Sequence, residues 1–132
     1  KEIGNVFNKV SPELIYMPFM LDVHSDHQII SNAIQSCIKW FRYPFIKKVL
    51  MYETISETDF NFIGGETFRP NVYIDISNHI DRKIETMKIY KSEFGVHPFP
   101  RSEKTIKALA TLRGSQSGYN YAEAFQLVLE RL

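Results

Sequence analysis

The residues best suited to chemistry lie in the run Asp22-Val23-His24-Ser25-Asp26-His27. Imidazole is the commonest protein ligand of zinc, and a carboxylate can orient a neighbouring ring. Two histidines three residues apart at a helix start can converge on one point, so His24 and His27 could serve a metal ion, a general acid or both. The pattern is short, and the competing interpretation is that both histidines are ordinary polar residues of a loop and a first helical turn.

The segments on either side of this run predict where it lies in the fold. Residues 14–19 form a short apolar run followed by a polar loop, which predicts a buried strand, and residues 3–10 look like the end of a preceding helix. Apolar residues at three- and four-residue spacing then predict an amphipathic helix from about Asp26 to Arg42, which Pro44 stops. The histidines therefore lie between the carboxyl end of a strand and the start of a helix, where open α/β sheets bind ligands.

This predicted helix carries a start signal and an apolar stripe. Ser25 and Gln28 match the S-x-x-Q capping box, in which a hydroxyl and an amide satisfy unpaired backbone donors. Helical spacing alone explains the stripe, so we expect it to face the core rather than a cofactor. Its members are Ile29, Ile30, Ala33, Ile34, Cys37, Ile38, Trp40 and Phe41.

The rest of the chain completes an α/β pattern. Residues 48–53 and 71–76 predict two further strands. Helices are expected after a cap at Ser77 or Asn78, from Ser102 to Arg113, and over the closing residues 121–132. The order strand, helix, strand, strand, helix, helix, helix predicts an α/β fold with a mostly parallel sheet. Three strands make a thin sheet, so we expect it to be part of a larger one whose first strands are absent.

Composition excludes several classes of function. The 132 residues include 16 basic and 15 acidic side chains without a concentration of either sign, which argues against a nucleic-acid or polybasic membrane partner. No apolar run reaches the roughly 18 residues of a membrane span, and the start lacks a signal-peptide pattern. The one cysteine, Cys37, excludes an internal disulfide and a cysteine-based zinc knuckle, and it fits a reducing compartment. We therefore expect a cytoplasmic protein.

Several segments, in the same order, resemble the PIG-L/LmbE family of zinc-dependent deacetylases of N-acetylglucosamine-type sugars. Residues 17–19 and 22–27 are similar to the family's P…D-x-H-P-D-H signature, with Ser25 where the family usually has proline. Further similar segments are 52–54, 68–71, 75–77, 83–85, 90–92, 100–102 and 121–125. The resemblance covers most of the chain and implies the C-terminal part of a Rossmann-like, three-layer α/β fold acting on an N-acetylated amino sugar.

The resemblance also implies roles for individual residues. His27 looks like the zinc ligand, His24 resembles the histidine that acts as general acid and stabilises the oxyanion, and Asp26 would orient a neighbouring imidazole. The family's first strand ends in a His-Pro-Asp-Asp-type motif that supplies two metal ligands and the general base, and this sequence contains no such motif. We expect residues 1–132 to be the C-terminal portion of a single deacetylase domain that lacks the N-terminal metal-binding strand and loop.

Three further residues are candidates for substrate binding. Arg101, in a Pro-Arg-Ser loop, could hold a sugar hydroxyl or phosphate, and it could equally cap a helix or face water. Tyr121 and Glu123 fall in a segment that resembles the rim of the family's active site. The competing interpretation makes Tyr121 part of the core face of the last helix, together with Phe125.

Two hypotheses from different classes follow. In the first, the chain is part of a metal-dependent hydrolase that removes the N-acetyl group from an N-acetylglucosamine-type sugar or conjugate, with an incomplete zinc site in this chain. In the second, it is a catalytically inactive remnant or assembly module that keeps the second half of the fold. Self-association into a homo-oligomer is open under both hypotheses.

Overall fold

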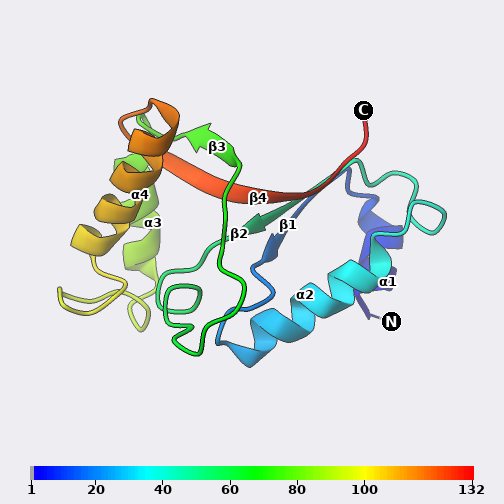
Figure 1. Cartoon of the computed structure of the whole chain (residues 1–132), viewed down its shortest axis with the longest axis horizontal. Coiled ribbons are helices and arrows are strands. Elements are labelled where there is room, and N and C mark those ends of the chain that lie inside the picture. Colours follow the sequence, from blue (N-terminus) through cyan, green and yellow to red (C-terminus); the bar gives the residue numbers. More distant parts are fainter. Residues whose placement is uncertain (1) are drawn as a thin grey trace. The chain divides into compact units, whose positions relative to one another are not determined.

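The computed structural model describes residues 2–132, which form four helices and four strands (Figure 1). The elements are α1 (Glu2–Val10), β1 (Leu14–Pro18), α2 (Ser25–Cys37), β2 (Lys48–Tyr52), β3 (Val72–Asp75), α3 (Ile80–Ile89), α4 (Glu103–Ser117) and β4 (Ala122–Glu130). The chain divides into two compact units. The first comprises the residues up to Asn71 together with Phe125–Leu132, and the second comprises Val72–Ala124.

The strands form a mixed sheet in the order β1-β2-β4-β3. β1 runs parallel to β2, in register from Leu14 opposite Lys48 to Pro18 opposite Tyr52. β2 then pairs antiparallel with β4, with a register shift between Val49 and Leu50. The predicted α/β class is confirmed, but the prediction of a mostly parallel sheet is wrong, because the final segment returns beside β2 in the opposite direction.

That final segment is the largest correction to the expected elements. Residues 121–132 were expected to be helical, whereas Ala122–Glu130 is the longest strand of the protein. Its alanine, glutamate, glutamine and leucine residues have good intrinsic helix propensity. Backbone pairing with the buried strand β2 overrides that preference, and a salt bridge of 2.8 Å from Lys48 Nζ to Glu130 Oε1 closes the end of the pairing.

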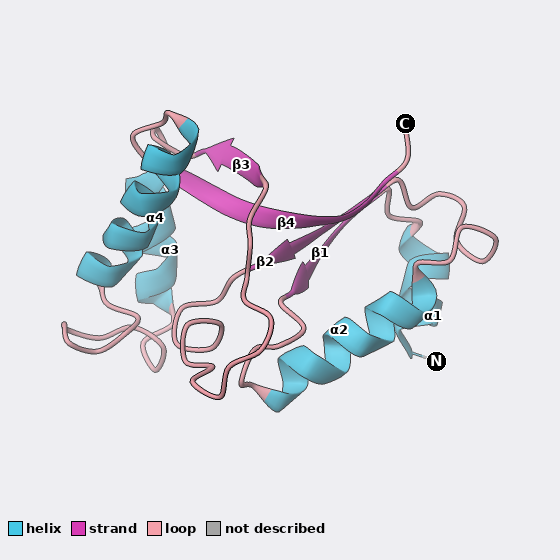
Figure 2. Cartoon of the chain, in the orientation of Figure 1, coloured by secondary structure: helices cyan, strands magenta, loops and turns pink. Residues whose placement is uncertain are grey.

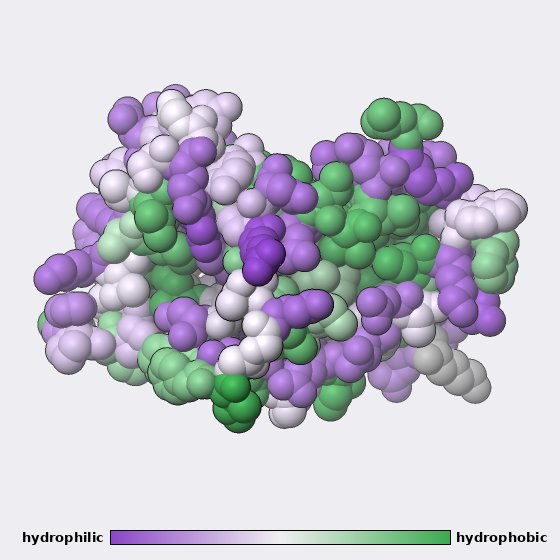
Figure 3. All heavy atoms as spheres, viewed as in Figure 1, coloured by the Kyte–Doolittle hydropathy of each residue, from purple (hydrophilic) through white to green (hydrophobic). Residues whose placement is uncertain are grey.

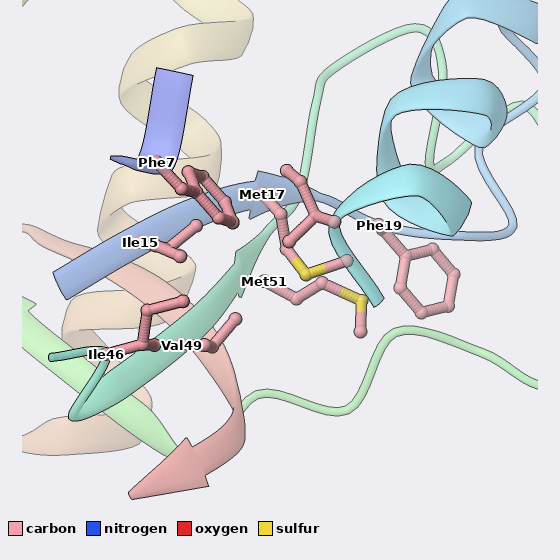
Figure 4. Close-up of a cluster of buried hydrophobic side chains, with 8 residues drawn as sticks. Phe7, Ile15, Met17, Phe19, Ile46, Val49 and Met51 are labelled. Carbon is pink, nitrogen blue, oxygen red and sulfur yellow. The ribbon is translucent and has the colours of Figure 1, made fainter. Parts of the chain in front are cut away.

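The core of the first unit lies between β1, β2 and the helices α1 and α2 (Figure 4). Alternate residues of the strands, Ile15 and Met17 on β1 and Val49 and Met51 on β2, point to one face because side chains alternate along a strand. The remaining members of this buried cluster are Phe7, Phe19, Ile34 and Ile46. This packing fixes the carboxyl end of β1, from which the histidine run continues.

Helix α2 is shorter than its apolar stripe predicts, and it buries a different face from the one that the stripe predicts. It ends at Cys37, where Ile38 N donates to Ile34 O, five residues before the expected end at Arg42. Its buried face centres on Ser31, whose hydroxyl donates to the carbonyl of Pro18 at 2.6 Å. This bond ties the helix to the end of β1. Half of the predicted core stripe is exposed: Ile29 and Ile30 within the helix, and Trp40 and Phe41 beyond its end.

The second unit packs α3 and α4 together and places α4 against β3. Its buried apolar residues include Ile80 and Ile84 of α3 and Ile106 and Ala110 of α4. Ser102 caps α4 by accepting from Thr105 N, and Gly118 ends it with a left-handed φ of 82°. Among the described residues, no helix combines the length and the apolar character that crossing a membrane requires.

Candidate active site

The histidine run occupies the connection from the end of β1 to the start of α2. The connection is held by Phe19, whose N–H donates to Tyr52 O at 3.0 Å and so extends the strand pairing by one residue. Asp22 N then donates to Phe19 O at 3.2 Å, which turns the chain towards the helix. The sequence placed both histidines between a strand end and a helix start. The structure has His24 between β1 and α2, as the N-cap of α2, and His27 inside the first turn of that helix.

Asp22 is the fully buried centre of this connection. Its Oδ2 lies 2.8 Å from His27 Nδ1, and its Oδ1 accepts from the hydroxyl of Thr58 at 2.6 Å. Its backbone carbonyl accepts from Gln28 Nε2 at 2.7 Å. A buried carboxylate is costly unless its oxygens are bonded, and here each oxygen has a partner.

The helix start is built differently from the expected capping box. His24 rather than Ser25 is the N-cap, with extended backbone angles, and its Nδ1 accepts from the N–H of Asp26 at 3.2 Å. The side chain of Gln28 bonds to the carbonyl of Asp22 instead of reaching the cap. The cap therefore lies one residue earlier than the capping-box pattern predicts, and an imidazole nitrogen takes the place of the serine hydroxyl as the acceptor.

The two imidazoles are held in complementary tautomers. His27 presents Nδ1 to a carboxylate, so in the neutral ring the proton lies on Nδ1 and Nε2 keeps a lone pair. His24 accepts a bond at Nδ1, so in the neutral ring the proton lies on Nε2, which can donate. The rings stack with centroids 5.0 Å apart and an interplanar angle of 26°. One histidine therefore offers an electron pair beside another that offers a proton.

The carboxylate that orients an imidazole is not the one expected from the sequence. Asp26 is exposed and contacts His24 through its backbone N–H, whereas the side chain of Asp22 bonds to His27. Sequence reasoning placed Asp22 inside the motif but gave it no role. Its position five residues before His27, directly after a strand, was the available signal.

Tyr52 lies at the end of β2 beside this cluster. Burial raises the pKa of its phenol above the ordinary value, and the negative charge of Asp22 raises this pKa further. Tyr52 consequently stays neutral at physiological pH and can donate a hydrogen bond near the histidine run.

The described residues contain no group of three or more histidine, cysteine, aspartate or glutamate side chains that could hold a metal ion. His27 alone fits a ligand role, because its Nδ1 is bonded to Asp22 and its Nε2 is available. Zinc binding, and the incompleteness of a zinc site in this chain, stay predictions. The identity of a metal stays a prediction.

The three predicted substrate-binding residues belong to the second unit, and we describe them within it. Arg101 bonds to Glu93 twice, from Nε to the carbonyl and from Nη2 to the carboxylate, each at 2.9 Å. Glu123 Oε1 lies 2.6 Å from Lys83 Nζ. Tyr121 precedes β4 rather than a helix, and its backbone bonds to Ser77 and Ile76. Their proposed contacts with substrate stay predictions.

Comparison with solved structures defines the class of fold. The N,N'-diacetylchitobiose deacetylase from Pyrococcus horikoshii superposes with a TM-score of 0.69 at 18% identity, over 97% of this chain and 50% of that protein. The conserved protein TT1542 from Thermus thermophilus gives a TM-score of 0.73 at 22% identity, over 99% of this chain and 58% of that protein. The chain therefore has the α/β fold of part of a deacetylase.

Sequence comparison leads to the same group of proteins. The chain is 24% identical over 132 residues to the diacetylchitobiose deacetylase of Thermococcus kodakarensis, covering 97% of this chain and 49% of that protein. No protein-family model matches the chain. The resemblance to PIG-L/LmbE deacetylases drawn from its motifs is confirmed by this relative and by the shared fold. The chain spans about half the length of the relative.

Proposed function

We propose that this chain supplies the histidine side of a metal-dependent active site that removes the N-acetyl group from an N-acetylglucosamine-type sugar. The similarity to a diacetylchitobiose deacetylase supports a deacetylase-like hydrolase. The observation that carries the proposal is the pair of stacked imidazoles in complementary tautomers, held by Asp22 and by the first turn of α2. A metal enzyme that hydrolyses an amide uses a side chain that binds the metal and, close to it, a side chain that donates a proton.

The residues of the chain divide the work as follows. His27 would hold the metal through Nε2, and the hydrogen bonds of Asp22 to His27 and to Thr58 fix the orientation of that ring. Zinc bound there would supply Lewis-acid polarisation of the acetamide carbonyl. His24 would stabilise the developing oxyanion by a hydrogen bond from Nε2 while water adds to the carbonyl carbon. Uptake of a proton at Nδ1 would turn its ring into an imidazolium, which would release the Nε2 proton to the leaving amine as the C–N bond breaks and acetate departs. Arg101, Tyr121 and Glu123 remain proposed contacts for the sugar.

The rest of the proposed site requires further polypeptide. Relatives of this fold are about twice as long, and β1 stands at the end of the strand order with Leu14 and Tyr16 exposed on it. Unpaired edge strands with apolar side chains are ready to pair with another strand. We propose that a preceding segment pairs with β1 and brings the missing metal ligands and the general base.

The second candidate is an inactive assembly module. It is favoured by the lack of a three-ligand cluster among the described residues and by the same exposed edge of β1. Such a module would bind another polypeptide through β1 without hydrolysing a sugar.

Acetate release separates the two candidates. The protein encoded by the whole gene should release acetate from N-acetylglucosamine derivatives, stop when a chelator removes the metal and recover when zinc returns. Residues 1–132 alone should release none, because catalytic zinc normally takes three protein ligands and this chain provides His27. An inactive whole-gene product would favour the assembly module. Chelator-sensitive turnover by residues 1–132 alone would contradict the proposed incomplete site.

A further inference from the structure

A long connection without helix or strand joins β2 to β3 in residues 53–71 (Figure 2). Its first part is folded on itself. Thr58 N donates to Thr54 O at 2.9 Å, and Thr54 N donates in return to Thr58 Oγ1 at 2.8 Å. The side chain of Thr58 is therefore held by the backbone of its own turn.

Two hydrogen bonds attach this turn to the connection that carries the histidines without involving the carboxylate of Asp22. Val23 N donates to Glu57 O at 3.2 Å, and Asn61 Nδ2 donates to Leu21 O at 3.1 Å. Both acceptors are backbone carbonyls. These bonds fix where the turn lies, but they do not orient the carboxylate that bonds to the histidine.

Apolar burial contributes little to holding the residues that follow the turn. Phe62 is 83% exposed and Ile63 is 98% exposed, and Phe60 is also exposed. Figure 3 shows apolar side chains at the lower edge of its face, where Figure 1 places the connection between β2 and β3. Directly after Thr58, hydrogen bonds rather than buried apolar contacts therefore hold the connection in place.

The partners of the Thr58 hydroxyl fix the direction of its hydrogen bond. A hydroxyl has one hydrogen and two lone pairs. The N–H of Thr54 occupies a lone pair of Thr58 Oγ1, and the one hydrogen points to Asp22 Oδ1, which lies 2.6 Å away. This bond keeps the buried carboxylate from turning, so that its Oδ2 stays 2.8 Å from His27 Nδ1.

We propose that Thr58 is a positioning residue of the histidine site, which through the carboxylate of Asp22 keeps the hydrogen of the neutral His27 ring on Nδ1 and a lone pair on Nε2. This inference rests on the proposed function for the ligand that Nε2 binds, and it deepens that function. Thr58 acts through Asp22, since its one hydroxyl hydrogen is used there. The turn after β2 thus sets the chemistry of a ring that follows β1.

The test uses the whole-gene protein with Thr58→Val, which removes the hydroxyl and keeps the branched shape, and with Thr58→Ser, which keeps the hydroxyl. Isotopically labelled histidine, with the metal removed, shows by NMR at about pH 8 which nitrogen of His27 carries the hydrogen, and His27→Ala assigns the signal. The unmodified protein and Thr58→Ser should show the hydrogen on Nδ1. Thr58→Val should show a mixture of the two forms, and its dissociation constant for zinc should rise about tenfold.

Two controls separate positioning from folding. Asn61→Ala removes a side-chain bond between the same loop and the same connection. It should lower the unfolding midpoint and leave both the His27 tautomer and zinc affinity unchanged. Thr54→Val removes a buried hydroxyl that has no hydrogen-bond partner among the described residues, and it keeps the N–H that bonds to Thr58. It should alter neither the tautomer nor the affinity.

Several results would overturn the positioning role. One is a Thr58→Val protein with the His27 hydrogen still on Nδ1 and zinc affinity within about twofold of the unmodified protein. Another is an equal change of tautomer in Asn61→Ala. A hydrogen on Nε2 of His27 in the unmodified protein would also overturn it, even if Thr58→Val does not fold. If the protein deacetylates no sugar but Thr58→Val still shifts the hydrogen of His27, the proposed function fails and the positioning role stands.

Discussion

The histidine connection of the first unit and the charged surface of the second unit use polar side chains in opposite ways. In the second unit, Glu103 bonds to both Lys88 and Lys107, and Arg101 bonds to Glu93. In each of these ion pairs, the charge of one side chain is neutralised by the opposite charge of its partner. In the first unit, Asp22 is buried and bonded on both oxygens, and it holds His27 through Nδ1, which leaves the Nε2 of that ring to face a ligand.

The contrast between the two units shows how polar residues that only stabilise the fold differ from those that can take part in a reaction. Exposed ion pairs contribute little to stability and leave no group for a ligand. A buried carboxylate costs free energy to place, and here its bonds serve to aim His27. A side-chain atom that can bind a ligand, next to a buried carboxylate such as Asp22, is therefore a better sign of an active site than a large number of charged residues.

Of the substitutions that test this comparison, we expect Asp22→Ala to change the free energy of unfolding most. Replacing Asp22 by Ala leaves the hydroxyl of Thr58 and the Nδ1 of His27 without their buried acceptor. We expect the free energy of unfolding to fall by about 3 kcal/mol, the order found when one partner of a buried pair is removed. Chemical denaturation followed by circular dichroism measures this change.

Asp26→Ala is the matched control, because Asp26 is an exposed carboxylate of the same connection. Its loss should cost less than about 1 kcal/mol, from its favourable place in the first helical turn. Equal effects of the two substitutions would remove the distinction between the buried carboxylate and the exposed one.

A smaller effect is expected at the contact between α2 and β1. Ser31→Ala removes the buried bond to the carbonyl of Pro18 and should lower the free energy of unfolding by about 1 kcal/mol. Ser36→Ala in the same helix removes an exposed bond to Ala33 O and should have almost no effect. The two denaturation curves decide whether Ser31 anchors the helix, and coincident curves would show that it does not.

The smallest expected effect is on how the unfolding midpoint changes with pH, through Glu103 of the second unit. Hydrogen bonds from Lys88 and then Lys107 lower the pKa of Glu103 below its ordinary value of 4.5. A lowered folded-state pKa gives stability that is present above 4.5 and is lost as pH falls through the folded pKa. Glu103→Gln should therefore flatten the fall of the unfolding midpoint between about pH 5 and pH 3. If the unfolding midpoint of Glu103→Gln fell with pH as steeply as that of the unmodified protein, this explanation would be wrong. Adding Lys88→Met to Glu103→Gln should change the pH dependence of the midpoint little further.

The sequence predicts the local surroundings of the site well. An apolar run before a polar loop predicts β1, and helical spacing predicts the start of α2, because both signals come from adjacent residues. The pairing of His24 with His27 follows from their three-residue spacing at that start.

What the sequence misses depends on distant contacts. Thr58 reaches Asp22 from 36 residues away, so neither the burial nor the role of Asp22 is visible in the motif. β4 looks helical because its residues favour helices, and only its pairing with β2 makes it a strand. The rotation of α2 likewise depends on a bond from Ser31 to the end of another element.

The most direct test of the account is the metal content and turnover of the whole-gene protein carrying His27→Ala or His24→Ala. His27→Ala should lose both the metal and acetate release, because it removes a ligand. His24→Ala should keep the metal and lose about 10²–10⁴-fold in rate, since it removes a proton donor. A His27→Ala protein that retained its full metal content, or a His24→Ala protein that lost it, would contradict the division of roles between the two rings.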